Sequence, residues 1–192
     1  MKINTFLSLT MLFAASSQTA MGKPLFIGDS LTYTLAKNYS QKAPVDAKYK
    51  VGSGLNNNIL NWQNYAEQVD FENYDTVFVV MGTNDPITAN QKGEYQHRAR
   101  VFIRTLKRKN DKVVWLLPPT LKNQRNNALL ANTRNALMEA AEQENIAWVD
   151  MRAALGTEYI QYLDGQQIRT HDGIHLTDAG ARLTLRTLNV IQ

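Results

Sequence analysis

Five short apolar runs alternate with segments of helical pattern along this chain, and this alternation constrains the fold more than any other feature. The runs that we predict to be strands span 24–27, 47–51, 74–81, 112–117 and 147–150. The predicted helices span 31–39, 59–69, 93–110, 128–145 and 179–190. Several runs are apolar throughout, which is typical of parallel strands that are buried on both faces. The pattern predicts an α/β fold in which helices cover both faces of a parallel sheet.

Three of the predicted strands end at turns that are rich in glycine and polar residues. These turns are Gly28-Asp29-Ser30, Gly52-Ser53-Gly54 and Gly82-Thr83-Asn84-Asp85. Right-handed crossovers bring the carboxyl ends of parallel strands to one edge of the sheet, and ligand crevices form at that edge. We therefore expect the three turns to face one crevice.

Ser30 stands where the first predicted strand turns into the first predicted helix. A hydroxyl at this position lies at the carboxyl end of a strand, and the helix behind it directs free backbone N–H groups towards any charge that develops there. The alternative is purely structural, because Asp29 and Ser30 are ordinary helix N-cap residues and Gly28 is an ordinary turn residue. Residues elsewhere in the chain decide between the two interpretations.

The loop before the last predicted helix contains the partners that a reactive serine needs. A serine hydroxyl is a poor nucleophile at neutral pH unless a base accepts its proton and a third group orients that base. Asp172 and His175 are three residues apart around a glycine, so the carboxylate can reach one imidazole nitrogen and leave the other free. The sequence thus offers Ser30, His175 and Asp172 as nucleophile, base and orienting group.

A serine that attacks a carbonyl group also needs donors that stabilise the oxyanion of the intermediate. The candidates are the backbone N–H of Ser30, the backbone N–H of Gly54 and the side-chain amide of Asn84. Glycine suits this task because the substrate oxygen must approach bare backbone, and an asparagine amide donates without titrating.

The motifs Gly28-Asp29-Ser30-Leu31, Gly82-Thr83-Asn84-Asp85 and Asp172-x-x-His175 resemble, in order, the signature blocks of the GDSL lipase/esterase family, also called SGNH hydrolases. The resemblance spans residues 25–176. It implies a three-layer, flavodoxin-like α/β/α sandwich with a five-stranded parallel sheet, and an ester hydrolase without metal or organic cofactor. The Gly-x-Ser-x-Gly elbow of α/β-hydrolases is absent, which disfavours that other fold.

The resemblance also implies roles for individual residues. Ser30 is then the nucleophile, His175 the base and Asp172 its partner. Gly54 and Asn84 are oxyanion donors beside the Ser30 amide, with Gly52 as the alternative glycine if the turn is shifted by two residues.

Three other interpretations of these residues remain open. His171, Asp172, His175 and Asp178 crowd a short segment and could ligate a metal, but no carboxylate-rich partner segment is evident elsewhere. A glycan-binding or scaffold module could use the same fold, although it would not need the whole set of groups. An O-acyltransferase would use the same triad and pass the acyl group to a sugar hydroxyl.

The N-terminus has the pattern of a secretory signal peptide, which we predict to span residues 1–22 and to precede a hydrolase domain at 23–192. Lys2 precedes an uncharged apolar run, 3–15, which is too short to span a bilayer comfortably. Ala20-Met21-Gly22 offers a cleavage site, with Ala15-Ser16-Ser17 as a competitor. The sequence has no cysteine, so it offers neither a disulfide nor a lipoprotein attachment site. We expect a periplasmic or secreted protein that is not stably inserted in the membrane.

The partners that the sequence indicates are acyl esters rather than nucleic acids. The formal net charge is +4, and no Lys/Arg run is interleaved with aromatic residues. We expect an exported monomeric serine esterase that removes small acyl groups, acetyl first, from a cell-envelope polysaccharide. A lysophospholipid or thioester substrate is the alternative.

Overall fold

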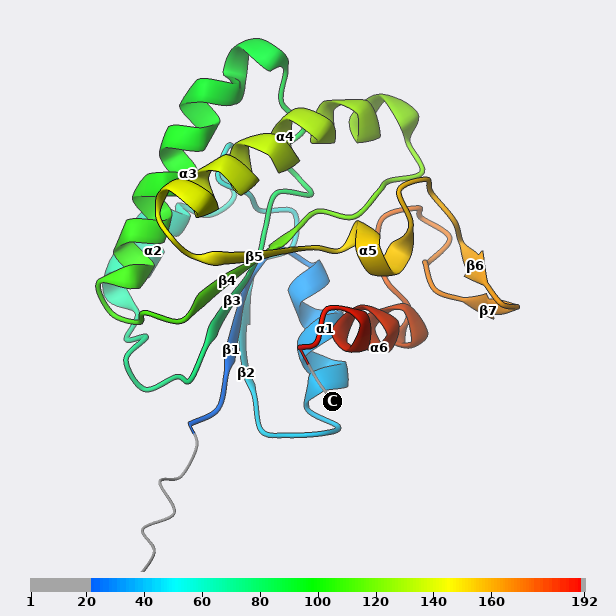
Figure 1. The fold of residues 1–192 in the computed structure, drawn as a ribbon, viewed down its shortest axis with the longest axis horizontal. Helices are drawn as coiled ribbons and strands as arrows, with labels where there is room; N and C mark the ends of the chain where they lie inside the picture. The colour runs from blue at the N-terminus through cyan, green and yellow to red at the C-terminus, as the bar shows by residue number, and fades with distance from the viewer. Residues whose placement is uncertain (1–21, 191–192) are drawn as a thin grey trace, which may run out of the picture.

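The structure, a computed structural model, describes residues 22–190 and contains a five-stranded parallel sheet between two layers of helices (Figure 1). The strand order is β2-β1-β3-β4-β5. These strands are β1 (Leu25–Gly28), β2 (Asp46–Tyr49), β3 (Val77–Val80), β4 (Val113–Leu117) and β5 (Ala147–Asp150). The predicted α/β/α sandwich with a five-stranded parallel sheet is confirmed.

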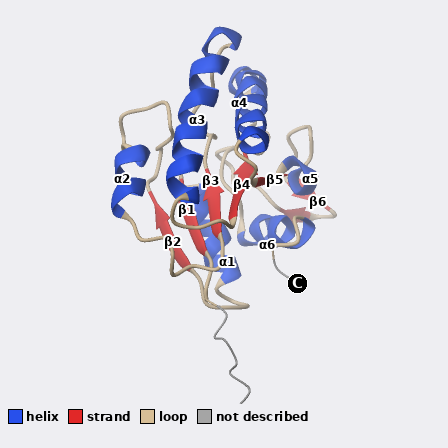
Figure 2. Ribbon diagram, turned by 60° about the vertical axis from the view of Figure 1, so that its left-hand side comes forward, coloured by secondary structure: helices blue, strands red, loops and turns tan. Residues whose placement is uncertain are grey.

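The helices divide between the two faces of the sheet (Figures 1 and 2). The helices α2 (Trp62–Gln68), α3 (Lys92–Lys107) and α4 (Gln124–Gln143) pack on one face. The helices α1 (Leu31–Tyr39), α5 (Arg152–Leu155) and α6 (Asp178–Thr187) pack on the other. The remaining elements are the 3-10 turn η1 (Ala89–Gln91) and a two-stranded hairpin of β6 (Tyr162–Leu163) and β7 (Gln166–Gln167).

Successive side chains of each central strand enter the two hydrophobic clusters in turn. Leu25 and Ile27 of β1 join the cluster under α2, α3 and α4, whereas Phe26 joins the cluster under α1, α5 and α6. Trp115 of β4 is fully buried, and Trp148 at the edge strand β5 is half-buried against the first cluster. Burial on both faces explains why these strands read as continuous apolar runs rather than as alternating ones.

Two helix starts differ by three residues or more from the sequence-based prediction. The helix α2 begins at Trp62 rather than at residue 59, and its cap is Asn61, whose Oδ1 accepts a hydrogen bond from the backbone N–H of Asn64 at 3.0 Å. The helix α4 begins four residues earlier than predicted, because Asn123 caps it through the backbone N–H of Asn126. In both places a side-chain amide decides the start of the helix, and apolar periodicity does not reveal it.

The predicted leader and its cleavage sites fall on residues 1–22, of which 1–21 lie outside the described residues. Between residues 22 and 190, no helix has both the length and the apolar character that a bilayer crossing requires. Because most of the predicted leader lies outside the described residues, it stays a prediction.

Candidate active site

The loops at the carboxyl edge of the sheet bring Ser30, His175 and Asp172 together. Ser30 is the N-cap of α1, two residues after the end of β1, and His175 lies in the loop before α6. The Oγ atom of Ser30 is 2.8 Å from Nε2 of His175, although the two residues are 145 positions apart. The Nδ1 atom of the same imidazole is 2.6 Å from Oδ2 of Asp172. Hydroxyl, imidazole and carboxylate thus form one continuous chain of hydrogen bonds.

The loop that carries Asp172 is shaped around its carboxylate. Oδ1 of Asp172 accepts hydrogen bonds from Thr170 Oγ1 at 2.6 Å and from the backbone N–H groups of Ile174 and His175 at 2.8 and 3.0 Å. Partial burial acts to raise the pKa of Asp172, but the hydrogen bonds from Thr170, His175 and the backbone outweigh it and hold the pKa well below its usual range. Asp172 is therefore ionised at neutral pH and orients the imidazole through Nδ1–H.

Arg169 stabilises the base of this loop, and no motif in the sequence predicts that role. Its side chain is fully buried, and Nη2 donates to the backbone carbonyl of Ile174 at 2.8 Å. The guanidinium carbon lies 5.1 Å from the ring centroid of Tyr159. Arg169 also pairs with Leu176 in an antiparallel bridge, which closes the base of the loop. A buried arginine that binds a single carbonyl has no characteristic spacing, so sequence reasoning missed it.

The structure also places Asn84 against the turn that holds Gly54. Nδ2 of Asn84 donates to the backbone carbonyl of Ser53 at 3.0 Å, which uses one of its two amide hydrogens. Among residues 22–190, no hydrogen bond uses the other amide hydrogen. The assignment of Asn84 and Gly54 as oxyanion donors stays a prediction, as does the alternative at Gly52, whose backbone has φ +75°.

Asp85 anchors the segment that follows Gly54, a role that sequence reasoning did not assign. Its Oδ2 accepts hydrogen bonds from the backbone N–H of Leu55 at 2.8 Å and from the Tyr95 hydroxyl at 2.7 Å, while Oδ1 accepts from the backbone N–H of Asn56 at 3.1 Å. Burial raises the pKa of Asp85. This carboxylate therefore ties the loop after β2 to helix α3.

We expect Gly54→Ala to lower the free energy of unfolding by about 3 kcal/mol or more, because a Cβ at this position would lie 2.1 Å from Oδ1 of Asp85. The carboxylate would have to move and release the backbone groups that it binds. Chemical denaturation measures the change. Gly93→Ala is the matched control, since a Cβ there meets nothing within 4 Å, and we expect it to change stability by less than about 1 kcal/mol, in the stabilising direction. Equal stabilities for the two variants would contradict this packing.

Asp29 lies beside Ser30 but is completely buried. Burial raises the pKa of Asp29 to about 7, against the opposing effect of the backbone N–H of Leu31, which donates to Oδ1 at 2.9 Å. The nearby Asp85 raises the pKa further. The native state therefore retains a proton on Asp29 under conditions in which the unfolded chain releases it.

This proton retention predicts a pH dependence of stability. Between about pH 4 and pH 7 the native state binds more protons at Asp29 than the unfolded chain does, so this group makes the protein less stable as pH rises through that window. The full effect is on the order of 4 kcal/mol. We expect the stability of Asp29→Asn relative to the original protein to increase from pH 4 to pH 8, as measured by urea unfolding. Stability curves that stay parallel across this range would contradict the raised pKa.

Of the four residues of the alternative metal site, Asp172 and His175 contact each other, whereas Asp178 and His171 are bound elsewhere. Asp178 faces helix α1, where its carboxylate lies 2.9 Å from Lys37 Nζ, and His171 Nδ1 lies 3.0 Å from Gln161 Nε2. Within the part of the chain that the structure describes, no group of three or more His, Cys, Asp or Glu side chains is arranged to hold a metal ion.

Comparison with known proteins places the chain in a family. The family model described as "Protein of unknown function (DUF459)" matches residues 23–189. The chain belongs to this family. DUF459 is an SGNH-like family, so the predicted relationship to the GDSL/SGNH hydrolases is confirmed. No curated protein matches the chain.

Solved structures similar to this DUF459 chain share its fold at low sequence identity. A lipase/acylhydrolase from Enterococcus faecalis is 14% identical, with a TM-score of 0.64 over 86% of this chain and 92% of that one. A member of the lipolytic G-D-S-L family from Veillonella parvula is 17% identical, with a TM-score of 0.63 over 88% and 97%. An acetylxylan esterase from Geobacillus stearothermophilus, solved as a catalytic mutant, is 18% identical, with a TM-score of 0.63 over 87% and 94%. The DUF459 chain therefore has the fold of these proteins.

Proposed function

We propose that this chain is a serine esterase that hydrolyses acyl esters through Ser30, His175 and Asp172. The observation that carries the proposal is the unbroken contact from the Ser30 hydroxyl through the His175 ring to the Asp172 carboxylate. An imidazole that is held on one nitrogen by an ionised carboxylate has its other nitrogen free to accept the serine proton. The names of the similar structures, which include a lipase/acylhydrolase and acetylxylan esterases, support the same class of reaction.

The reaction divides into acylation and deacylation. His175 Nε2 removes the proton from Ser30 Oγ as that oxygen bonds to the ester carbonyl carbon, and the carbonyl electrons move onto oxygen. The protonated His175 then gives the proton to the departing alcohol, which leaves an acyl group on Ser30. Water repeats both steps and releases the carboxylic acid. The charge on the substrate oxygen is met by the N–H groups of Ser30 and Gly54 and by the Asn84 amide, and the loss of one such donor costs about 10²–10³ in rate.

The substrate class that we propose is an O-acetyl ester on a polysaccharide of the cell envelope. The predicted leader and the resulting periplasmic or secreted location support it, as do the acetylxylan esterases among the similar structures. The alternative of a lysophospholipid or thioester is supported by the lipase/acylhydrolase of the same fold. An O-acyltransferase would differ only in the second step, where a sugar hydroxyl replaces water.

A chain-length series of p-nitrophenyl esters, from the C2 acetate to the C16 palmitate, tests the proposal. We expect the highest kcat/KM at C2, together with release of acetic acid from acetylated glycans. An optimum at C8 or longer would overturn the acetyl assignment in favour of lipid-like substrates. No hydrolysis across the whole series would overturn the esterase assignment itself.

A further inference from the structure

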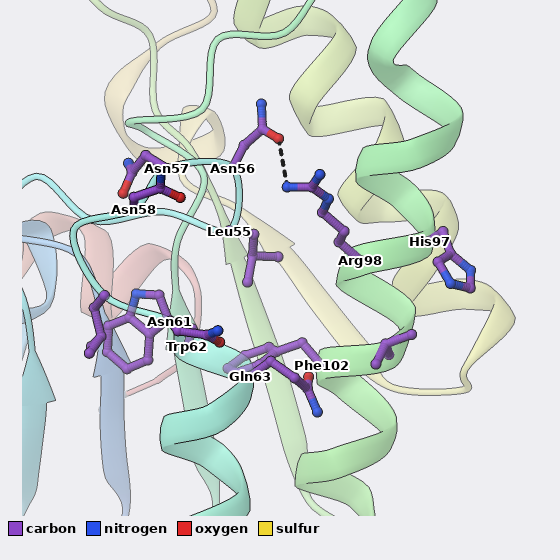
Figure 3. Close-up of a pocket in the computed structure, with 12 residues that line it drawn as sticks. Leu55, Asn56, Asn57, Asn58, Asn61, Trp62, Gln63, His97, Arg98 and Phe102 are labelled. Atoms are coloured by element: carbon purple, nitrogen blue, oxygen red, sulfur yellow. Dashed lines mark hydrogen bonds between the residues drawn. The ribbon is translucent and has the colours of Figure 1, made fainter.

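A pocket of about 530 Å³ opens between the loop after β2 and helix α3 (Figure 3). Its wall begins at Leu55, the residue after the proposed oxyanion glycine Gly54. The backbone N–H groups of Leu55 and Asn56 are held by Asp85, which directly follows the second proposed oxyanion donor, Asn84. The pocket and the proposed oxyanion hole therefore share one loop. The volume lies in the usual range of small-molecule sites and is far larger than an acetyl group of three heavy atoms requires.

The pocket has an apolar floor and a polar rim. The floor consists of the apolar lining residues, which are buried or half-buried, whereas most of the polar ones are exposed: Leu55, Leu60, Trp62, Val101 and Phe102. The rim carries five side-chain amides with one imidazole and one guanidinium, namely Asn56, Asn57, Asn58, Asn61, Gln63, His97 and Arg98. Neither Asp nor Glu is among the lining residues. Neutral groups that both donate and accept hydrogen bonds thus predominate at the rim.

Several of these amides already make hydrogen bonds to other parts of the protein. Asn57 binds the Gly52 carbonyl through Nδ2 at 3.1 Å and accepts from the backbone N–H of Ile59. Asn61 caps α2, and Gln63 donates to the Thr105 hydroxyl at 2.7 Å. These side chains shape the pocket rather than present free groups to it.

Asn56 and Arg98 differ, because they present donors at the mouth of the pocket. Figure 3 shows the two side chains facing each other, with Oδ1 of Asn56 accepting from Nη1 of Arg98 at 3.1 Å. No hydrogen bond among residues 22–190 uses the Asn56 amide hydrogens. The charge of Arg98 is balanced by Glu94, one helical turn earlier on α3. The rim is therefore polar but has no uncompensated charge of its own that would select an anion.

We propose that this pocket binds a neutral sugar ring of an acetylated glycan, next to the ring whose acetyl ester lies at Ser30; the inference rests on the proposed esterase function. A sugar ring presents C–H groups to an apolar floor and hydroxyls to amide and guanidinium groups at a rim. A long acyl chain would pack on the same floor, but it would offer no acceptor to the amide hydrogens of Asn56, and burying such a donor without a partner costs about 1–3 kcal/mol. The geometry therefore favours the sugar ring as occupant.

The test compares acetylated monosaccharides with acetylated trisaccharides of the same sugar: xylose with xylotriose, glucose with cellotriose, and mannose with mannotriose. We expect at least one trisaccharide to be deacetylated with a kcat/KM about tenfold above that of its monosaccharide. Asn56→Ala and Arg98→Ala should each reduce this preference severalfold, through KM, and leave kcat/KM for p-nitrophenyl acetate within twofold. Arg108→Ala is the matched control, because Arg108 is an exposed arginine at the C-terminal end of α3 that also pairs with a glutamate.

The outcomes separate this proposal from the proposed function. If p-nitrophenyl acetate is hydrolysed but no trisaccharide is preferred, or if the preference survives both substitutions, the sugar subsite is wrong and the esterase assignment stands. If p-nitrophenyl acetate is not hydrolysed, the esterase assignment is wrong, and the sugar subsite that rests on it is wrong as well. Val101→Trp, which fills the floor of the pocket, provides a further check. A selective loss on p-nitrophenyl octanoate, with trisaccharide preference retained, would assign the pocket to an acyl chain and overturn the proposal.

Discussion

Ser30→Ala is expected to lower kcat for p-nitrophenyl acetate by at least about 10³-fold while the protein stays folded. The substitution removes the oxygen that lies 2.8 Å from His175 Nε2, so no acyl-enzyme can form. The substitution should leave helix α1 intact, because the Ser30 side chain makes no capping hydrogen bond to it. Circular dichroism and urea unfolding check that the fold is retained.

The matched control for this substitution is Ser40→Ala. Ser40 is an exposed serine at the other end of the same helix, where its Oγ donates to the Lys37 carbonyl at 2.7 Å. We expect this variant to keep its activity within about twofold, as surface substitutions remote from the site usually do. A Ser30→Ala variant that stays fully active would refute the assignment of the nucleophile.

Asp172→Asn is expected to lower kcat by about 10³–10⁴-fold with little change in KM. Three donors, from Thr170, Ile174 and His175, converge on Oδ1 of this side chain and require an acceptor there. The new amide must therefore turn its oxygen towards them and its NH₂ towards Nδ1 of His175. That nitrogen must then accept, so the ring proton moves to Nε2, where it prevents the ring from taking the Ser30 proton.

Asp164→Asn is the control for this change of charge. Asp164 is an exposed aspartate in the turn between β6 and β7, with φ +48°, a conformation that asparagine tolerates well. We expect its kinetics to match those of the unmodified protein. If Asp172→Asn retained more than about a tenth of the original kcat, the proposed orienting role of the carboxylate would be wrong.

Much of the layout of the site could be predicted from the sequence, because parallel topology makes strand ends converge. The glycine turns after β1, β2 and β3 placed Ser30, Gly54 and Asn84 at one edge, and the three-residue spacing of Asp172 and His175 predicted their mutual contact. The 2.8 Å contact between Ser30 and His175 could only be inferred from the chemistry that a serine requires, since the two residues lie at opposite ends of the chain.

The supporting residues could not be predicted, because each acts through a contact that leaves no local pattern. Arg169 binds one backbone carbonyl of the Asp172 loop, and Asp85 binds two backbone N–H groups of a distant loop together with a tyrosine hydroxyl. The shortest helix and strands were not predicted from the sequence either. The four-residue α5 and the two-residue strands β6 and β7 are too brief to show a period.

The most direct test of the central claim is covalent labelling with a fluorophosphonate probe, followed by peptide mass spectrometry. Such probes phosphonylate a serine only where a neighbouring base makes it nucleophilic. The account predicts one modified residue, Ser30, and strongly reduced labelling in His175→Ala. Modification of a different serine, or no modification of the folded protein, would contradict it.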